Sequence, residues 1–181
     1  MKKLALGLIL GVLMLAVPAA TFAQGVDWYG HFEKGDFSVG AGLGLGFGGW
    51  GYGLSIFPGA EYTVADWRIG DTVPLALGVS ARGLIGFSNY YGTVFGIGPF
   101  VTLHLGFRDA EFFPEFLQKL DLYTALGLAV TFGGNTALYN PVGLNQYFGL
   151  NYFVNDKLAL YLEENYWGYY VGTTLGVLFK F

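Results

Sequence analysis

The sequence has no cysteine and few charged residues. The absence of cysteine from its 181 residues excludes a disulfide framework, a thiolate metal site and a lipoprotein anchor. Charged residues make up 12% of the chain, against roughly 25% in soluble domains. Only two histidines occur, and no group of residues has the spacing of a metal site. Because basic residues form no patch, a nucleic-acid partner is also disfavoured. We therefore expect no metal, no cofactor and no nucleic acid.

Apolar runs long enough to cross a membrane as a helix are also scarce, and the single one lies at the N-terminus. Two lysines precede an apolar stretch over residues 4–17, and a small-x-small sequence ends at Ala23. This pattern predicts a cleaved secretory signal peptide over residues 1–23, with an uncleaved anchor helix as the alternative. Loss of the two lysines leaves seven basic and thirteen acidic residues, a net charge of -6.

What the chain does contain is a strict alternation of apolar with small or polar residues. In the last stretch, one face carries Leu175, Val177, Phe179 and Phe181, and the other carries glycine, threonine and Lys180. The same period of two recurs along the chain and predicts eight strands, each long enough to cross a bilayer when tilted, which takes roughly 9–11 residues. The predicted strands are residues 37–48, 52–64, 73–87, 93–108, 119–132, 142–154, 157–166 and 169–181.

Alternation alone fits either a soluble ligand-carrying barrel or a membrane barrel. A soluble barrel turns its apolar face inward and needs a highly charged outer face. Here the second face is mostly Gly, Ala, Ser, Thr, Asn and Tyr, which suits the filling of a narrow interior. We therefore predict an all-β fold: an eight-stranded antiparallel up-and-down transmembrane β-barrel over residues 37–181, with no second domain.

Three local features carry further expectations. Pro58 lacks a ladder donor and predicts a bulge in the second strand. Residues 24–36 read as an irregular lead-in whose Trp28 and Phe32 lie at a membrane interface, like the aromatic stretch Tyr166–Tyr170 at the other rim. The connection over residues 109–118 predicts a short interfacial helix or a plain turn; the face of that helix would carry Phe112, Phe113, Phe116 and Leu117.

Charged residues on the inward face are the candidate functional groups. Hairpin counting pairs His104 with Asp121 and sets Glu61 at a similar depth, which predicts a polar layer in the half of the barrel that holds the termini. Such a carboxylate–histidine group could act as an acid or base or line a proton or ion path. We favour the alternative, a buried polar plug in which the charges pair because the narrow lumen leaves no room for free hydration. The predicted inward charges are Glu61, Arg82, Asp121, Lys157, Glu163 and Lys180, with His104 among them.

Glycine neighbours suggest how the longest of these side chains cross the lumen. Arg82 is expected beside glycines of the next strand, so the sequence predicts an ion pair between Arg82 and Glu163, with Glu61 as the rival partner. Lys180 would be the lowest member of the polar column. A Gly-x-Gly-x-x-Gly match over residues 44–49 lies in a strand with no helix after it, so it does not indicate a dinucleotide site.

The signal peptide, the eight strands and the ending Leu175-x-Val177-x-Phe179-x-Phe181 resemble the small eight-stranded outer-membrane barrels of two-membrane bacteria, such as the OmpA membrane domain, OmpX and OmpW. The resemblance is architectural and covers the whole mature chain. It implies periplasmic termini, residues 24–36 as a periplasmic lead-in, and a terminal strand read by the outer-membrane assembly machinery. The implied partners are outer-membrane lipids, that machinery and periplasmic chaperones, with the barrel itself a monomer.

For function, these observations favour a non-catalytic barrel with a structural or envelope-integrity role and a lumen filled by side chains. The alternative is a narrow OmpW-like channel for small or hydrophobic solutes, which the many inward glycines would suit. An outer-membrane lipid-modifying enzyme would need a nucleophile beside His104, and the sequence does not place one there.

Overall fold

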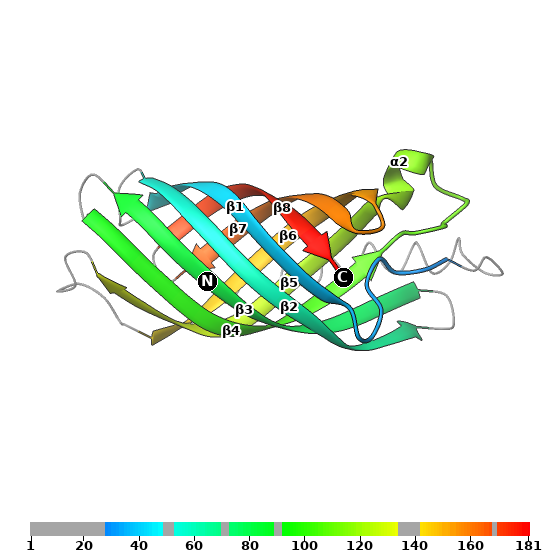
Figure 1. Cartoon of the computed structure of the whole chain (residues 1–181), viewed down its shortest axis with the longest axis horizontal. Helices are drawn as coiled ribbons and strands as arrows, with labels where there is room; N and C mark the ends of the chain where they lie inside the picture. The colour runs from blue at the N-terminus through cyan, green and yellow to red at the C-terminus, as the bar shows by residue number, and fades with distance from the viewer. Residues whose placement is uncertain (1–27, 49–52, 70–72, 89–91, 134–141, 168–169) are drawn as a thin grey trace.

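The computed structural model describes residues 28–48, 53–69, 73–88, 92–133, 142–167 and 170–181. In this part of the chain, eight strands form a closed antiparallel barrel in chain order (Figure 1), which confirms the predicted fold. The predicted signal peptide lies outside the described residues. The strands are β1 (Phe37–Gly48), β2 (Gly53–Ile69), β3 (Val73–Ser88), β4 (Gly92–Gly106), β5 (Leu120–Gly133), β6 (Val142–Asn155), β7 (Leu158–Trp167) and β8 (Tyr170–Lys180).

The barrel closes where its first strand meets its last. The ladder between β1 and β8 runs from Ser38 opposite Lys180 to Gly48 opposite Tyr170. Beyond it, the N–H of Phe181 donates to the carbonyl of Phe37 at 2.8 Å. This seam leaves no free strand edge, as a barrel in lipid requires.

The outward face is apolar along the barrel. Leu144 and Leu175 are each 65% exposed and Ile97 is 60% exposed, as are many other large hydrophobic side chains on alternate positions. Exposed apolar surface of this extent marks a contact with lipid or another apolar partner. The alternate positions point inward, where Ser38, Thr102 and other small polar residues are buried. The outside is therefore suited to a bilayer.

β2 differs from its predicted form. It continues to Ile69 instead of ending at residue 64, and its bulge lies between Thr63 and Ala65, so the prediction of a bulge at Pro58 was wrong. Pro58 stays in register opposite Ala41, because a missing donor interrupts a ladder without requiring an extra residue. The true bulge switches the outward positions of β2 from even to odd numbers.

Lys157 was predicted to point into the lumen, and it does not. It is exposed in the turn between β6 and β7. The side-chain oxygen of Asn155 accepts hydrogen bonds from the N–H groups of Lys157 and Leu158, at 2.9 and 3.0 Å. Because Asn155 forms this turn, β6 ends at residue 155, one residue beyond its predicted end.

A one-turn helix, α2 (Glu115–Gln118), lies between β4 and β5 at the end of the barrel that also holds the C-terminus (Figure 1). We call this the terminal end. Phe116 is 59% exposed on the helix, whereas Phe112 and Phe113 precede it. Phe113 packs against Phe107, and Phe112 packs against Phe113. The predicted helix is thus present, but the aromatic residues of this connection do not form one face. Among the described residues, no helix has the length and apolar content needed to cross a membrane.

Residues 28–36, which we call the N-terminal strap, turn into the mouth of the barrel at the terminal end. Trp28 is completely buried and Phe32 is 3% exposed. Phe32 lies in the lumen with Ala76 and Phe153, so the expectation of a membrane interface was wrong for this ring. Trp28 packs against Val73 and Leu105, which occupy outward-facing positions of β3 and β4. Its ring is therefore buried beside the outer wall at the terminal end, where the connection between β4 and β5 covers it.

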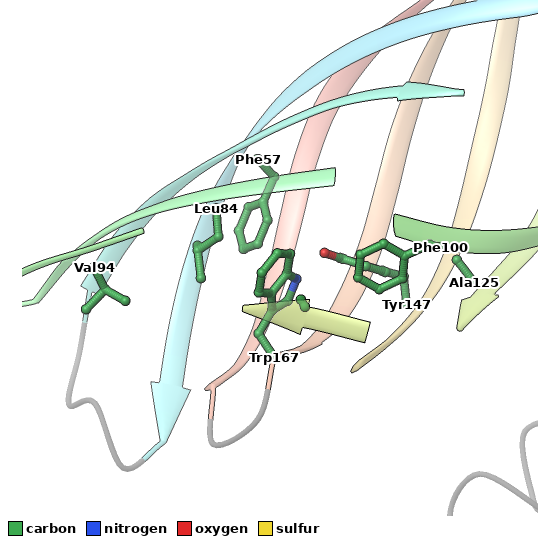
Figure 2. Close-up of a cluster of buried hydrophobic side chains, with 8 residues drawn as sticks. Phe57, Leu84, Val94, Phe100, Ala125, Tyr147 and Trp167 are labelled. Atoms are coloured by element: carbon green, nitrogen blue, oxygen red, sulfur yellow. The ribbon is translucent and has the colours of Figure 1, made fainter. Parts of the chain in front are cut away.

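The opposite half of the lumen is filled by a cluster of apolar side chains (Figure 2). Trp167 lies at its centre with no exposed surface. It ends β7, as predicted for a residue near the rim, but its ring points into the lumen and does not form part of an interfacial girdle. Its ring centroid is 5.9 Å from that of Phe100 and 6.1 Å from that of Tyr147. Gly96 makes room for it, because a Cβ atom there would meet the indole ring. The cluster consists of Phe57, Leu84, Val94, Phe100, Ala125, Ala129, Tyr147 and Trp167.

Candidate functional site in the lumen

A buried imidazole lies between two carboxylates in the terminal half of the lumen. His104 Nε2 is 2.6 Å from Glu61 Oε1, and His104 Nδ1 is 2.9 Å from Asp121 Oδ2. Asn151 donates to the same oxygen of Asp121 at 2.8 Å. If both carboxylates are ionised, each ring nitrogen must carry a proton, so the geometry is that of an imidazolium held by two anions.

The predicted trio is brought together, but by a different register from the predicted one. His104 lies opposite Tyr123, and Asp121 lies opposite Gly106, so the imidazole and the carboxylate meet diagonally across the ladder. Glu61 reaches His104 from β2, past the intervening strand. Gly78 on β3 allows this passage, because a Cβ atom there would meet the Glu61 carboxylate.

A second ionic layer lies deeper in the barrel. Arg82 on β3 reaches across the lumen to Glu163 on β7, with Nη1 and Oε2 2.9 Å apart. Tyr123 donates to the same glutamate oxygen at 2.6 Å. Glu61 is a more distant partner, 3.9 Å from the guanidinium, so this arginine links the two layers. The guanidinium also lies 5.3 Å from the ring centroid of Tyr147, at the base of the apolar cluster.

Glycine again provides the space for a long side chain in this layer. A Cβ atom at Gly149 would meet the ring of Tyr123, and one at Gly59 would meet the side chain of Arg82. Inward glycines such as these, which could have indicated an open channel, are thus covered by their large neighbours. Tyr123 lies on the inward face of β5, but no feature of the sequence indicates that it binds Glu163.

Lys180 serves the strap. Its Nζ donates to the backbone carbonyl of His31 at 2.6 Å and to Asp36 at 3.1 Å. The sequence predicted that this lysine belongs to a polar column in the lumen. Its partners in the structure are strap residues, and the alternation of the strands contains no information about the strap.

His31 lies in the strap beneath the ionic layers. Its Nε2 is 2.9 Å from the carbonyl oxygen of Gln118, and its ring stacks on Phe153 with centroids 4.3 Å apart. Burial lowers the pKa of His31 below its ordinary value, although Asp121 and the Gln118 carbonyl act in the opposite direction. At neutral pH the ring is therefore uncharged and donates its Nε2 proton to Gln118.

Little empty volume remains between these groups. A cavity of about 20 Å³ lies beside Glu61, Arg82, Tyr123 and Tyr161, which is room for about one water molecule. In the described part of the chain, three barriers close the lumen one after another: the apolar cluster around Trp167, the two ionic layers and the strap.

The chemistry open to this site is limited by burial. His104 is 3% exposed, and both of its nitrogens are engaged by carboxylates, which leaves neither free to activate a nucleophile. Among the described residues, no group of three or more His, Cys, Asp or Glu side chains is arranged to hold a metal ion. The arrangement is that of a paired, buried ionic network.

Solved structures share the architecture. A de novo designed transmembrane β-barrel matches with a TM-score of 0.53 at 17% identity, over 83% of this chain and 98% of the designed one. The N-terminal β-barrel domain of Pseudomonas aeruginosa OprF gives 0.51 at 15% identity, over 83% of this chain and 100% of that domain. Neisserial surface protein A gives 0.47 at 18%, over 81% and 96%. No protein-family model and no curated protein sequence matches the chain. The closed eight-stranded barrel and the first two likenesses give this chain the fold of the small eight-stranded outer-membrane β-barrels.

Proposed function

We propose that the protein is a structural component of the outer membrane of a two-membrane bacterium, exported by a cleaved signal peptide and closed to solutes. The observation that carries this proposal is the filled lumen, whose central cavity holds about 20 Å³ beside Arg82. An apolar exterior with a plugged interior binds lipid and gives the envelope a rigid, impermeable cylinder.

The narrow channel remains the competing function, and three barriers in series disfavour it. A solute on the barrel axis would have to displace Trp167, break the pair between Arg82 and Glu163, and remove the strap that buries Phe32. Breaking a buried ion pair is costly because each charge loses its partner.

The outward row on β8 supports a second part of the proposal. Leu175, Val177, Phe179 and Phe181 all have exposed side chains, from 37% for Val177 to 71% for Phe181. These side chains are thus accessible for recognition by the barrel assembly machinery before lipid covers them. We propose this machinery and the periplasmic chaperones as partners, with the mature barrel a monomer.

Single-channel recording in planar bilayers tests the closed lumen. We expect no steady conductance steps from the refolded full-length protein, because ions find no continuous aqueous path through the aromatic cluster and the ionic layers. The same sample should run compactly on a denaturing gel when unheated and shift on boiling, which shows that a folded barrel was tested. Steady single-channel steps from such a sample would replace the closed barrel by the channel.

Two tryptophan variants test whether the apolar cluster alone closes the lumen. Trp167 is the largest side chain of the apolar cluster, and Trp67 lies outside on the same barrel, 40% exposed. Conductance should be absent in Trp67→Ala, as in the unmodified protein. The ionic layers should also keep Trp167→Ala closed to steady current.

A further inference from the structure

The strap is attached to the barrel wall by hydrogen bonds from several separate elements. Tyr29 donates its backbone N–H to the carbonyl of Arg108 at 2.7 Å, and Gly35 donates to the carbonyl of Thr63 at 2.9 Å. The strap carbonyl of His31 accepts from Lys180. Each bond is individually worth only about 0.5–1.5 kcal/mol net, so docking depends on all of them together.

Two basic side chains lie against the buried ring of Phe32. Its centroid is 4.2 Å from that of the His104 ring and 5.8 Å from Lys180 Nζ. A ring face attracts cations by about 0.5–2 kcal/mol, most when water is excluded. The docked strap is therefore in direct contact with the ionic layer above it.

Protonation of His31 in the strap would oppose docking. His31 is buried against Phe153 and donates one proton to Gln118. A second proton would place a charge close to Arg108 and Lys180, which already act to lower its pKa, while only Asp121 and the Gln118 carbonyl favour the charged form.

The other charged groups around the strap are paired with one another. Glu61 and Asp121 hold His104 above the strap, and Asp36 holds Lys180 beside it. His31 has no carboxylate partner within salt-bridge distance among the described residues.

The direction of the pH effect follows from linkage. Burial lowers the pKa of His31 in the docked strap, whereas in the released strap it titrates near the ordinary 6.5. The released form therefore binds more protons as the pH falls through 6.5, and docking is weakened there. Above that pH both forms are neutral and docking is complete.

We propose that residues 28–36 are a detachable lid on the terminal mouth of the lumen, docked at neutral pH and released in mild acid. Release uncovers Ala76 and Ala159, which pack under Phe32, and exposes the His104 layer to solvent. The aromatic cluster around Trp167 at the other end keeps its contacts, so the open lid gives a vestibule and no through-pore. The lid thus goes beyond the proposed structural role and is independent of conductance.

The absence of cysteine makes a direct test possible. In Ala76→Cys the new thiol lies under the strap, and in Ala129→Cys a matched thiol lies in the aromatic cluster at the other end. Both alanines are buried, at 3% and 2% exposure. Each full-length variant, refolded in detergent, is treated with 4,4′-dithiodipyridine at pH 7.5 and pH 5.

The expected result is a change at one site only. The rate at Ala76→Cys, divided by that at Ala129→Cys, should rise by about 3- to 30-fold between pH 7.5 and pH 5; the upper limit is set by proton uptake between 6.5 and 5. Equal rises at both sites mean general loosening of the barrel and overturn the lid. A ratio that does not change with pH overturns it as well.

The residue responsible is tested by His31→Gln in the Ala76→Cys chain. The glutamine amide can still donate to Gln118 but does not titrate, so protection at pH 7.5 should persist and the rise at pH 5 should vanish. Retention of the rise overturns the role of His31. If the strap of this variant is undocked at both pH values, hydrogen exchange of the Tyr29 and Gly35 amides in the unmodified chain is measured instead. The lid requires these amides to exchange faster at pH 5 than at pH 7.5, after correction for intrinsic rates, while the β5 amides stay protected. Unchanged exchange of the strap amides overturns the lid.

Discussion

Replacement of Glu163 by alanine is expected to lower the free energy of unfolding by about 3–5 kcal/mol. The carboxylate is 1% exposed and accepts both the Arg82 guanidinium and the Tyr123 hydroxyl. Its loss leaves a guanidinium in the lumen with only the more distant Glu61 carboxylate as an ionic partner. The measurement is equilibrium unfolding in denaturant with lipid vesicles, followed by tryptophan fluorescence and by unheated gel mobility.

The neighbouring glutamate provides the control. Glu164 points outward and accepts a hydrogen bond from Thr173 at 2.6 Å in an exposed position. We expect Glu164→Ala to change the unfolding free energy by no more than about 0.5 kcal/mol. Removal of both charges, in Arg82→Met with Glu163→Leu, should recover part of the loss, since no unpaired charge remains. Equal losses for the two glutamates would show that the cross-lumen pair is not a major source of stability.

His104→Ala is expected to cost a similar amount, about 3–5 kcal/mol. The imidazole is the shared partner of Glu61 and Asp121, so its removal leaves two buried carboxylates near one another with no cation between them. It also removes the ring against which Phe32 packs. The same unfolding experiment measures this loss, and exchange of the strap amides should show that docking is weakened as well.

A charge-neutral variant separates charge from shape in that layer. In the triple replacement Glu61→Gln, His104→Gln and Asp121→Asn, every side chain keeps hydrogen-bonding capacity and none is charged. If the unpaired carboxylates cause the loss in His104→Ala, the triple variant should be more stable than the single one. A triple variant that is less stable than His104→Ala would assign the effect to lost packing and hydrogen-bond geometry.

The strands could be predicted from the sequence because their signal is local. Each alternation, such as Leu175 to Phe181 on β8, needs only a few adjacent residues to define two faces. The bulge at Thr63 was missed because an extra residue is defined by the pairing of β2 with β3, which no local pattern contains. Pro58 was a reasonable but wrong candidate, since the loss of one donor does not change register.

Inward orientation was equally predictable, whereas partners were not. Parity alone assigned Glu61, Arg82 and Glu163 to the lumen, and all three are there. Which side chains meet across a barrel depends on the stagger of its strands, and for His104 the hairpin count was two residues out. The glycines that open these paths, Gly78 above all, were visible in the sequence, but their long neighbours could be assigned only in three dimensions.

The position of the strap could not be predicted for a different reason. Trp28 and Phe32 are aromatic, as the side chains of an interfacial anchor are, and an irregular segment has no period that shows which way its rings face. The burial of Phe32 depends on Phe153, and that of Trp28 depends on Val73 and Leu105, residues far along the chain.

The seam between β1 and β8 also bears on how the chain folds. Ser38 and Lys180 are partners from opposite ends of the barrel sequence, so their pairing closes almost the whole chain into one loop. The entropy cost of closing this loop is offset only when the contacts of the seam form. Until then, both strands present unpaired backbone groups, which lipid cannot satisfy. We expect insertion to be cooperative, with seam closure as a late, concerted step and partly closed barrels too costly to accumulate in the bilayer.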